Sequence, residues 1–260
     1  MTPLEIIGLI ATLLMGVVLG LAGAGGSILT VPILVYLFGV SATQATGVSL
    51  AIVGGVAFLA AIIAHRKGDL DPKAAVLFGI PSVLIAFSIR RWLIPAVPES
   101  IGGLHKESLL LVLFALAMFM AARAMLRGTT GDQSSVRRPS QWILGGLGAG
   151  TVTGVLGAGG GFVIVPALHA GMGLPIRKAI GTSLAVISLN AGAGLLAEIA
   201  TQSDIPWEIA GRLGLFAVGG MALGMALQSR ISNKKLKVGF GILIIGVAIF
   251  ILGNEIFAFR

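Results

Sequence analysis

Long apolar runs separated by short polar breaks extend along the whole chain, and they predict ten hydrophobic segments, five in each half. Most runs reach about 18 residues, the length of a helix that crosses a membrane. The second run of each half has only about 14 residues, or about 21 Å as a helix, which is too short to cross. The expected segments cover about 3–21, 26–39, 42–64, 73–95 and 106–127, then 141–156, 160–173, 175–199, 205–228 and 236–253.

This pattern predicts an all-α fold, a polytopic helical membrane protein. The chain is 56% hydrophobic and 11% charged, with a mean hydropathy of +1.02, more apolar surface than a soluble domain of this size could bury. A β-barrel would need alternating apolar and polar positions, whereas these runs are continuous. Pro32 and Pro166 lie in the short segments and favour the first turn of a helix, so part of each short segment is expected to be non-helical.

One glycine-rich phrase occurs twice and shows an internal duplication. Residues 20–34 are GLAGAGGSILTVPIL and residues 154–168 are GVLGAGGGFVIVPAL, at an offset of 134 residues. Over residues 20–51 the two copies agree at fourteen of thirty-two positions. We expect one integral membrane domain made of two repeats, residues 1–127 and 141–260, joined by a cytoplasmic linker over residues 128–140.

The basic residues decide between two topologies. If each glycine run merely kinks a helix, each half crosses four times, and the Lys and Arg residues other than Arg212, which lies inside an apolar run, divide eight against nine. If each run reverses the chain, they divide thirteen against four, which is a clear positive-inside distribution. The second topology places both termini outside the cytoplasm. Because each half then has five segments, the halves have opposite orientations, and each combines a broken-helix hairpin with three spanning helices.

The glycine runs are the candidate substrate site. Glycine adopts backbone conformations that expose main-chain N–H groups, and such groups at membrane depth bind anions when they are gathered at a helix N-terminus. Two inverted hairpins are expected to face each other and form one compact anion site. The alternative for any single glycine is close helix packing. The candidate residues are Gly23, Ala24, Gly25, Gly26, Ser27 and Ser49 in the first repeat, and Gly157, Ala158, Gly159, Gly160, Gly161, Thr182 and Ser183 in the second.

Other polar residues are weaker candidates for substrate binding or proton coupling. The alternative for Ser49 and Ser183, which are equivalent in the duplication, is a hydrogen bond within or between helices. Asn190 lies two turns deeper and is a weaker candidate. His169, in the second short segment, could couple transport to protons, although a lone buried histidine is more often structural. No catalytic motif occurs, and we expect no enzyme activity, cofactor or metal.

The charge and cysteine content exclude further classes. The net charge of +8 resides in short loops between apolar runs, where it sets topology and contacts lipid headgroups, so nucleic acid is not an expected partner. The chain has no cysteine, and therefore no disulfide and no thiolate metal site. The N-terminus lacks the basic region of a secretory signal, and we expect no cleavage.

The repeated phrase, followed in both halves by Ala-x-x-x-Gly-x-Ser-Leu, resembles the TauE/SafE family of bacterial and archaeal membrane proteins, also called sulfite exporter-like. The resemblance covers essentially the whole chain. It implies a substrate class, because family members are associated with sulfite, sulfoacetate and related organosulfonates, usually in export. The family is usually drawn with about eight spanning helices.

Together these observations predict a secondary transporter that exports small sulfur-containing oxyanions across a prokaryotic cytoplasmic membrane by alternating access. A small-anion channel and a non-transporting assembly protein are the alternatives. The expected partners are the anion and the lipid bilayer. A coupling proton or sodium ion and a homodimer stay open.

Overall fold

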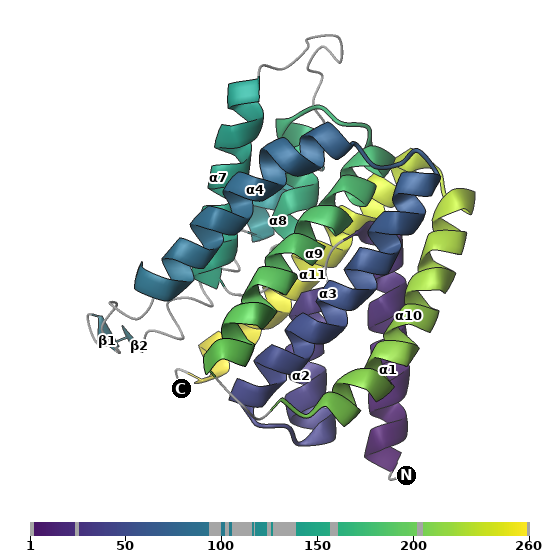
Figure 1. Cartoon of the computed structure of the whole chain (residues 1–260). Coiled ribbons are helices and arrows are strands. Elements are labelled where there is room, and N and C mark those ends of the chain that lie inside the picture. The colour runs from purple at the N-terminus through teal and green to yellow at the C-terminus, as the bar shows by residue number, and fades with distance from the viewer. Residues whose placement is uncertain are drawn as a thin grey trace.

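The computed structural model describes residues 3–23, 26–93, 100–101, 104–105, 116, 118–123, 126, 139–156, 161–201 and 205–258. Nearly all of them are helical (Figure 1). The long helices are α1 (Pro3–Ala22), α3 (Ala42–Arg66), α4 (Pro72–Ser88), α7 (Pro139–Leu156), α9 (Ile176–Thr201), α10 (Trp207–Arg230) and α11 (Asn233–Ala258). Shorter ones are α2 (Gly26–Phe38), α8 (Gly161–Pro166) and two π-helical turns, Ile89–Leu93 and Ala167–Gly171, beside a minimal antiparallel pair, β1 (Ser100–Ile101) and β2 (Leu104–His105).

These bounds confirm the all-α prediction and match nine of the ten expected segments within a few residues. The tenth, 106–127, lies mostly outside the described residues. The expectation about proline was wrong for Pro32, because α2 stays helical through that position. Pro166 does mark a change, since α8 ends there and the π-helical turn Ala167–Gly171 begins.

The two halves repeat the same order of elements at the offset of the duplication. Helices α1, α2, α3 and α4 correspond to α7, α8 with its π-helical turn, α9 and α10. The two short segments also end alike. Glycines with positive φ, Gly39 and Gly173, follow them, and the next N–H groups bond back to Leu34 and Leu168, at 3.1 and 3.0 Å. This hydrogen bond across six residues is the helix stop that glycine allows.

Helix packing follows the same correspondence. α1 packs on α10 at one side of the molecule, and its equivalent α7 packs on α4 at the other, with α3 and α9 between them (Figure 1). Both outer pairs depend on glycine. Gly16 and Gly20 face the backbone of α10 at Ala217 and Met221, and the equivalent residues Gly150 and Gly154 face the backbone of α4. Small residues at these positions let helix backbones approach closely within a membrane.

The central pair, α3 and α9, runs antiparallel. Leu50 touches Gly194, Gly54 touches Ala191, and Ala64 lies against Gly181. Interpolation between these contacts puts residue 55 level with residue 190 and residue 56 level with residue 189. In the duplication, residue 190 is equivalent to residue 56 and residue 189 to residue 55. This point is therefore the midpoint of the pair, where each helix stands beside its own duplicate at the same level.

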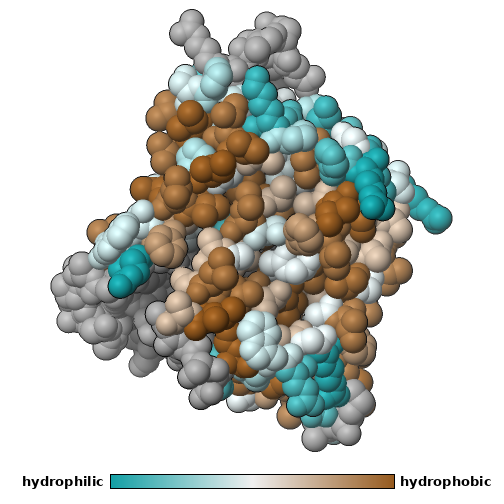
Figure 2. All heavy atoms as spheres, in the orientation of Figure 1, coloured by the Kyte–Doolittle hydropathy of each residue, from teal (hydrophilic) through white to brown (hydrophobic). Residues whose placement is uncertain are grey.

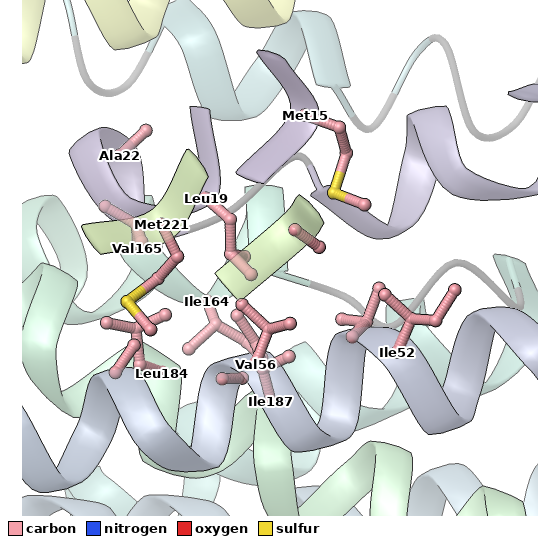
Figure 3. Packing of buried hydrophobic residues seen from close by; sticks show 14 of the residues in the cluster. Met15, Leu19, Ala22, Ile52, Val56, Ile164, Val165, Leu184, Ile187 and Met221 are labelled. Carbon is pink, nitrogen blue, oxygen red and sulfur yellow. The ribbon is translucent and has the colours of Figure 1, made fainter. Parts of the chain in front are cut away.

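The interior and the surface are both apolar. Side chains from α1, α3, α8, α9 and α10 meet in one cluster, which includes Leu19, Val56, Ile164, Leu184 and Met221 (Figure 3). Outside, hydrophobic residues form a broad area with hydrophilic residues gathered toward its edges (Figure 2). Five helices among the described residues are long and apolar enough to cross a membrane, which supports a multi-pass membrane protein.

Candidate functional site

The first glycine run leaves α1 through a left-handed turn. Gly23 has φ of +64°, and its N–H donates to the Leu19 carbonyl at 2.8 Å, which ends the helix. The chain resumes as α2 at Gly26. Residues 24–25 and 157–160, the centres of both candidate runs, lie outside the described residues, as does the side chain of Ser27. The described edges of the runs therefore define the site.

Gly23 lies against the second repeat. A Cβ atom added to it would stand 2.6 Å from Ile180 Cγ2 and 2.9 Å from Ser183 Oγ. The buried Ser183 hydroxyl lies 2.8 Å from the Gly23 carbonyl oxygen and 2.7 Å from the Ile180 carbonyl oxygen, and its single proton serves these two acceptors. The second turn of α9 therefore holds the first glycine run.

Thr182 is fully buried beside this contact and binds the loop between α3 and α4. Its hydroxyl oxygen accepts a hydrogen bond from the Asp71 N–H at 3.0 Å. Gly181 faces the backbone of Asp69 in the same loop. Both candidate hydroxyls of α9 are thus engaged with backbone groups of the first repeat in this conformation.

Ser49 lies far from Ser183. It is buried in the second turn of α3, whereas Ser183 is in the second turn of α9, and the two helices run antiparallel. Because Gly181 lies against Ala64, Ser183 is nearly level with Ile62, thirteen residues beyond Ser49, and at 1.5 Å per residue this is about 20 Å along the helix. The expectation that both serines contact one small anion therefore does not fit this conformation, because the inversion carries equivalent residues toward opposite ends.

One end of the helices is basic. The α3–α4 loop meets the start of α9 there, and Arg177 donates to Asn233 Oδ1 and to the Ile231 carbonyl oxygen, both at 2.9 Å, which ties in the turn between α10 and α11. We call this the basic end; its cations are Arg66, Lys67, Lys73, Arg177, Lys178, Arg230, Lys234 and Lys235. The opposite end carries Glu198 and Ile205, which face Gly47 near the start of α3.

His169 lies in the π-helical turn that ends the second short segment. Its Nδ1 atom is 2.8 Å from the Leu174 carbonyl oxygen. A carbonyl can only accept, so Nδ1 carries hydrogen here. The contact gives the side chain a structural role.

Two buried polar side chains stand out because they make no hydrogen bond within the described part of the chain. They are Ser82, which is fully buried on α4, and Asn190 on α9, whose amide nitrogen and oxygen are both buried. Leaving such groups unpaired costs about 1–3 kcal/mol each. Sequence analysis missed Ser82 because one serine in an apolar run has no pattern that marks it. Among the described residues, no three His, Asp or Glu side chains gather as metal ligands.

Comparison with known proteins supports the family resemblance that the repeated phrase indicates. The family model Sulfite exporter TauE/SafE matches residues 8–251. A probable membrane transporter protein of Xylella fastidiosa strain 9a5c is 35% identical over 251 residues, which are 92% of this chain and 91% of the relative. Another, of Methanocaldococcus jannaschii, is 25% identical over 248 residues, 88% of each chain.

A third probable membrane transporter protein, of Bacillus subtilis, is 27% identical over 184 residues, 70% of this chain and 74% of the relative. No solved structure matches the chain. The family match extends over nearly the whole chain and includes both copies of the glycine phrase. The chain therefore belongs to the TauE/SafE family of membrane proteins.

Proposed function

We propose that this membrane transporter is a secondary exporter of small sulfur-containing oxyanions, such as sulfite or organosulfonates, across a prokaryotic cytoplasmic membrane. The observation that carries the proposal is the antiparallel packing of α3 and α9, which are duplicates of each other, each preceded by a short returning helix. Inverted repeats with interrupted helices are the common architecture of secondary transporters. Relatives of this chain are named probable membrane transporter proteins, which supports the same class.

Each glycine run forms one station for the anion in this proposal. The first station, Gly23 to Ser27 with Thr182 and Ser183, lies toward the basic end. The second, Gly157 to Gly161 with Ser49, lies toward the opposite end. Backbone N–H groups of the turns, together with the N-termini of α2 and α8, would bind the oxyanion. Since Ser183 now holds the Gly23 carbonyl, its release would accompany anion binding at the first station.

Alternating access follows from the same symmetry. An exchange of conformation between the two halves would convert a transporter open at one end into one open at the other, around the central α3–α9 pair. The outer pairs, α1 with α10 and α4 with α7, each join helices from different halves. They would therefore slide when the halves rock against each other.

Sidedness and energetics favour export. The basic end faces the cytoplasm by the positive-inside rule, which puts both termini on the periplasmic side. A membrane that is negative inside drives a monovalent anion outward with about 2.3 kcal/mol per 100 mV. Export therefore needs no coupled ion, whereas import would need protons or sodium. His169 is the proposed proton carrier for that case, and a homodimer is compatible with the apolar outer surface.

The test is a thermal-shift screen of the purified protein against sulfite, sulfate, sulfoacetate, taurine and carboxylates, followed by flux into liposomes. We expect sulfite or a sulfonate to raise the melting temperature, and preloaded unlabelled substrate to accelerate uptake of labelled substrate. A channel would show no such acceleration. If no anion stabilises the protein or moves, the proposed function is wrong.

A further inference from the structure

Asn190 lies at the midpoint of the central α3–α9 pair. Its duplicate is Val56, and the contacts between α3 and α9 put residues 55 and 56 level with 190 and 189. This level is the midpoint of the antiparallel α3–α9 pair, and it lies midway between the two proposed stations. An amide is out of place here, since Val56, its equivalent, is a buried hydrophobic residue.

The amide of Asn190 is unpaired. Both its nitrogen and its oxygen are buried, and neither has a hydrogen-bond partner within the described residues. Asparagine in a membrane helix normally bonds to a neighbouring helix. Hydroxyls elsewhere in the membrane helices behave as expected, because those of Thr151 and Thr153 on α7 donate to the carbonyls four residues earlier, both at 2.8 Å. The amide therefore adds nothing to the packing of this conformation that a hydrophobic side chain would lack.

A second unpaired group lies at the same level on the neighbouring helix. α4 and α9 run parallel, because Asp71 bonds to Thr182 at their start and Gly79 faces Val186 further along. Ser82 is three residues beyond Gly79, and Asn190 is four residues beyond Val186. The Ser82 hydroxyl is fully buried and has no partner in the described part of the chain. Two packed helices thus hold unpaired donors at one depth.

We propose that Asn190, assisted by Ser82, binds the transported oxyanion at the midpoint of its path. The inference rests on the proposed function and names a residue pair for it. The Nδ2 hydrogens of Asn190 and the Ser82 hydroxyl donate to oxyanion oxygens, and Asn190 Oδ1 accepts from a hydroxyl or a water molecule that the ion carries. Neutral donors bind an anion without holding it as tightly as a fixed positive charge would, which suits a site that must release its ligand on either side.

This role predicts that stability and transport respond in opposite directions to one substitution. Asn190→Leu removes the unpaired amide and keeps a side chain of similar size, so the ligand-free protein melts at the same temperature as the wild type or higher. The same change removes donors to a charged ligand, so the substrate concentration for half-maximal flux rises at least about tenfold. If Asn190 were only structural, Asn190→Leu would lower the melting temperature and leave the substrate concentration for half-maximal flux unchanged.

The experiment measures melting temperature with and without sulfite, and sulfite flux into liposomes, for the wild type, Asn190→Leu, Ser82→Ala and Leu196→Ala. Ser82→Ala provides a second test that keeps the helix and barely changes volume. Leu196→Ala is the control, because Leu196 is 70% exposed on the same helix. We expect weaker sulfite flux and a smaller sulfite-induced shift in the first two variants, with the control unchanged.

The possible failures are distinguishable. If wild-type protein moves and binds sulfite while Asn190→Leu and Ser82→Ala keep its half-saturation, the inference is wrong and the proposed function stands. If Asn190→Leu melts lower with unchanged half-saturation, Asn190 is structural and the inference is also wrong. If the wild type moves no anion, the proposed function itself fails.

Discussion

The hydroxyl of Ser183 lies 2.8 Å from the carbonyl oxygen of Gly23, a residue 160 positions earlier in the chain. The contact joins the second repeat to the glycine run of the first. It also explains why the run needs glycine, since a Cβ atom at position 23 would meet both Ile180 and Ser183. The first repeat thus depends on the second for the shape of its candidate site.

Removing this hydroxyl should loosen the turn. Ser183→Ala leaves the buried Gly23 carbonyl without its side-chain donor, which should lower the free energy of unfolding by about 1–2 kcal/mol and reduce flux. Thermal unfolding in detergent and liposome flux measure the two effects. Ser88→Ala is the control, because the Ser88 hydroxyl only bonds back to Leu84 within its own helix. Equal behaviour of the two variants would contradict the role given to Ser183.

Gly23 and Gly39 form a matched pair for separating strain from steric clash. Both have φ of +64°, but no atom of the described residues lies within 4 Å of a Cβ at Gly39. Gly39→Ala should therefore cost only the left-handed backbone strain, about 1 kcal/mol, and keep transport. Gly23→Ala should cost about 3 kcal/mol or more and abolish most flux, because the new methyl group displaces α9. Similar losses in both variants would show that the contact with α9 is unimportant.

Close packing of α1 on α10 offers a second matched pair. A Cβ at Gly220 would collide with the Leu13 carbonyl, whereas a Cβ at the adjacent Gly219 meets nothing within 4 Å in the described part of the chain. We expect Gly220→Ala to lower the melting temperature by several degrees as the helices separate. Gly219→Ala should leave it unchanged or raise it slightly, because alanine favours helix. Differential scanning fluorimetry decides, and an unaffected Gly220→Ala protein would refute the close contact.

The chain contains no cysteine, so single cysteines can report its sidedness. Ser41 and Glu208 are exposed toward the opposite end, and Lys67 and Lys234 are exposed at the basic end. A membrane-impermeant maleimide should label Ser41→Cys and Glu208→Cys in intact cells. It should label Lys67→Cys and Lys234→Cys only after permeabilisation. The inverse pattern would overturn the proposed orientation.

His169 can be tested without disturbing substrate binding. We expect His169→Asn to remove any acceleration of flux by a proton gradient, because asparagine has no group that can carry the proton. Exchange of labelled for unlabelled substrate without a gradient should continue. Liposomes with and without an imposed pH difference measure both. A variant that keeps its response to the gradient would leave His169 only the structural bond to Leu174.

The sequence alone determined the class of the protein and the order of its elements. Apolar run length predicted the helices, because a bilayer accepts only backbone that satisfies its own hydrogen bonds. The duplicated phrase predicted both chain reversals and indicated the family. Gly39 and Gly173 are equivalent in the same duplication, and the structure shows that both adopt positive φ, which glycine tolerates.

Tertiary structure decided where these elements meet. Antiparallel packing of α3 and α9 separates Ser49 from Ser183, which residue spacing could not show, because equivalent positions in an inverted pair move apart in proportion to their distance from the axis. It also brought Ser183 to Gly23, across 160 residues. Only packing revealed that Ser82 and Asn190 have no hydrogen-bond partner among the residues that the structure describes, since pairing depends on which neighbours the fold brings near.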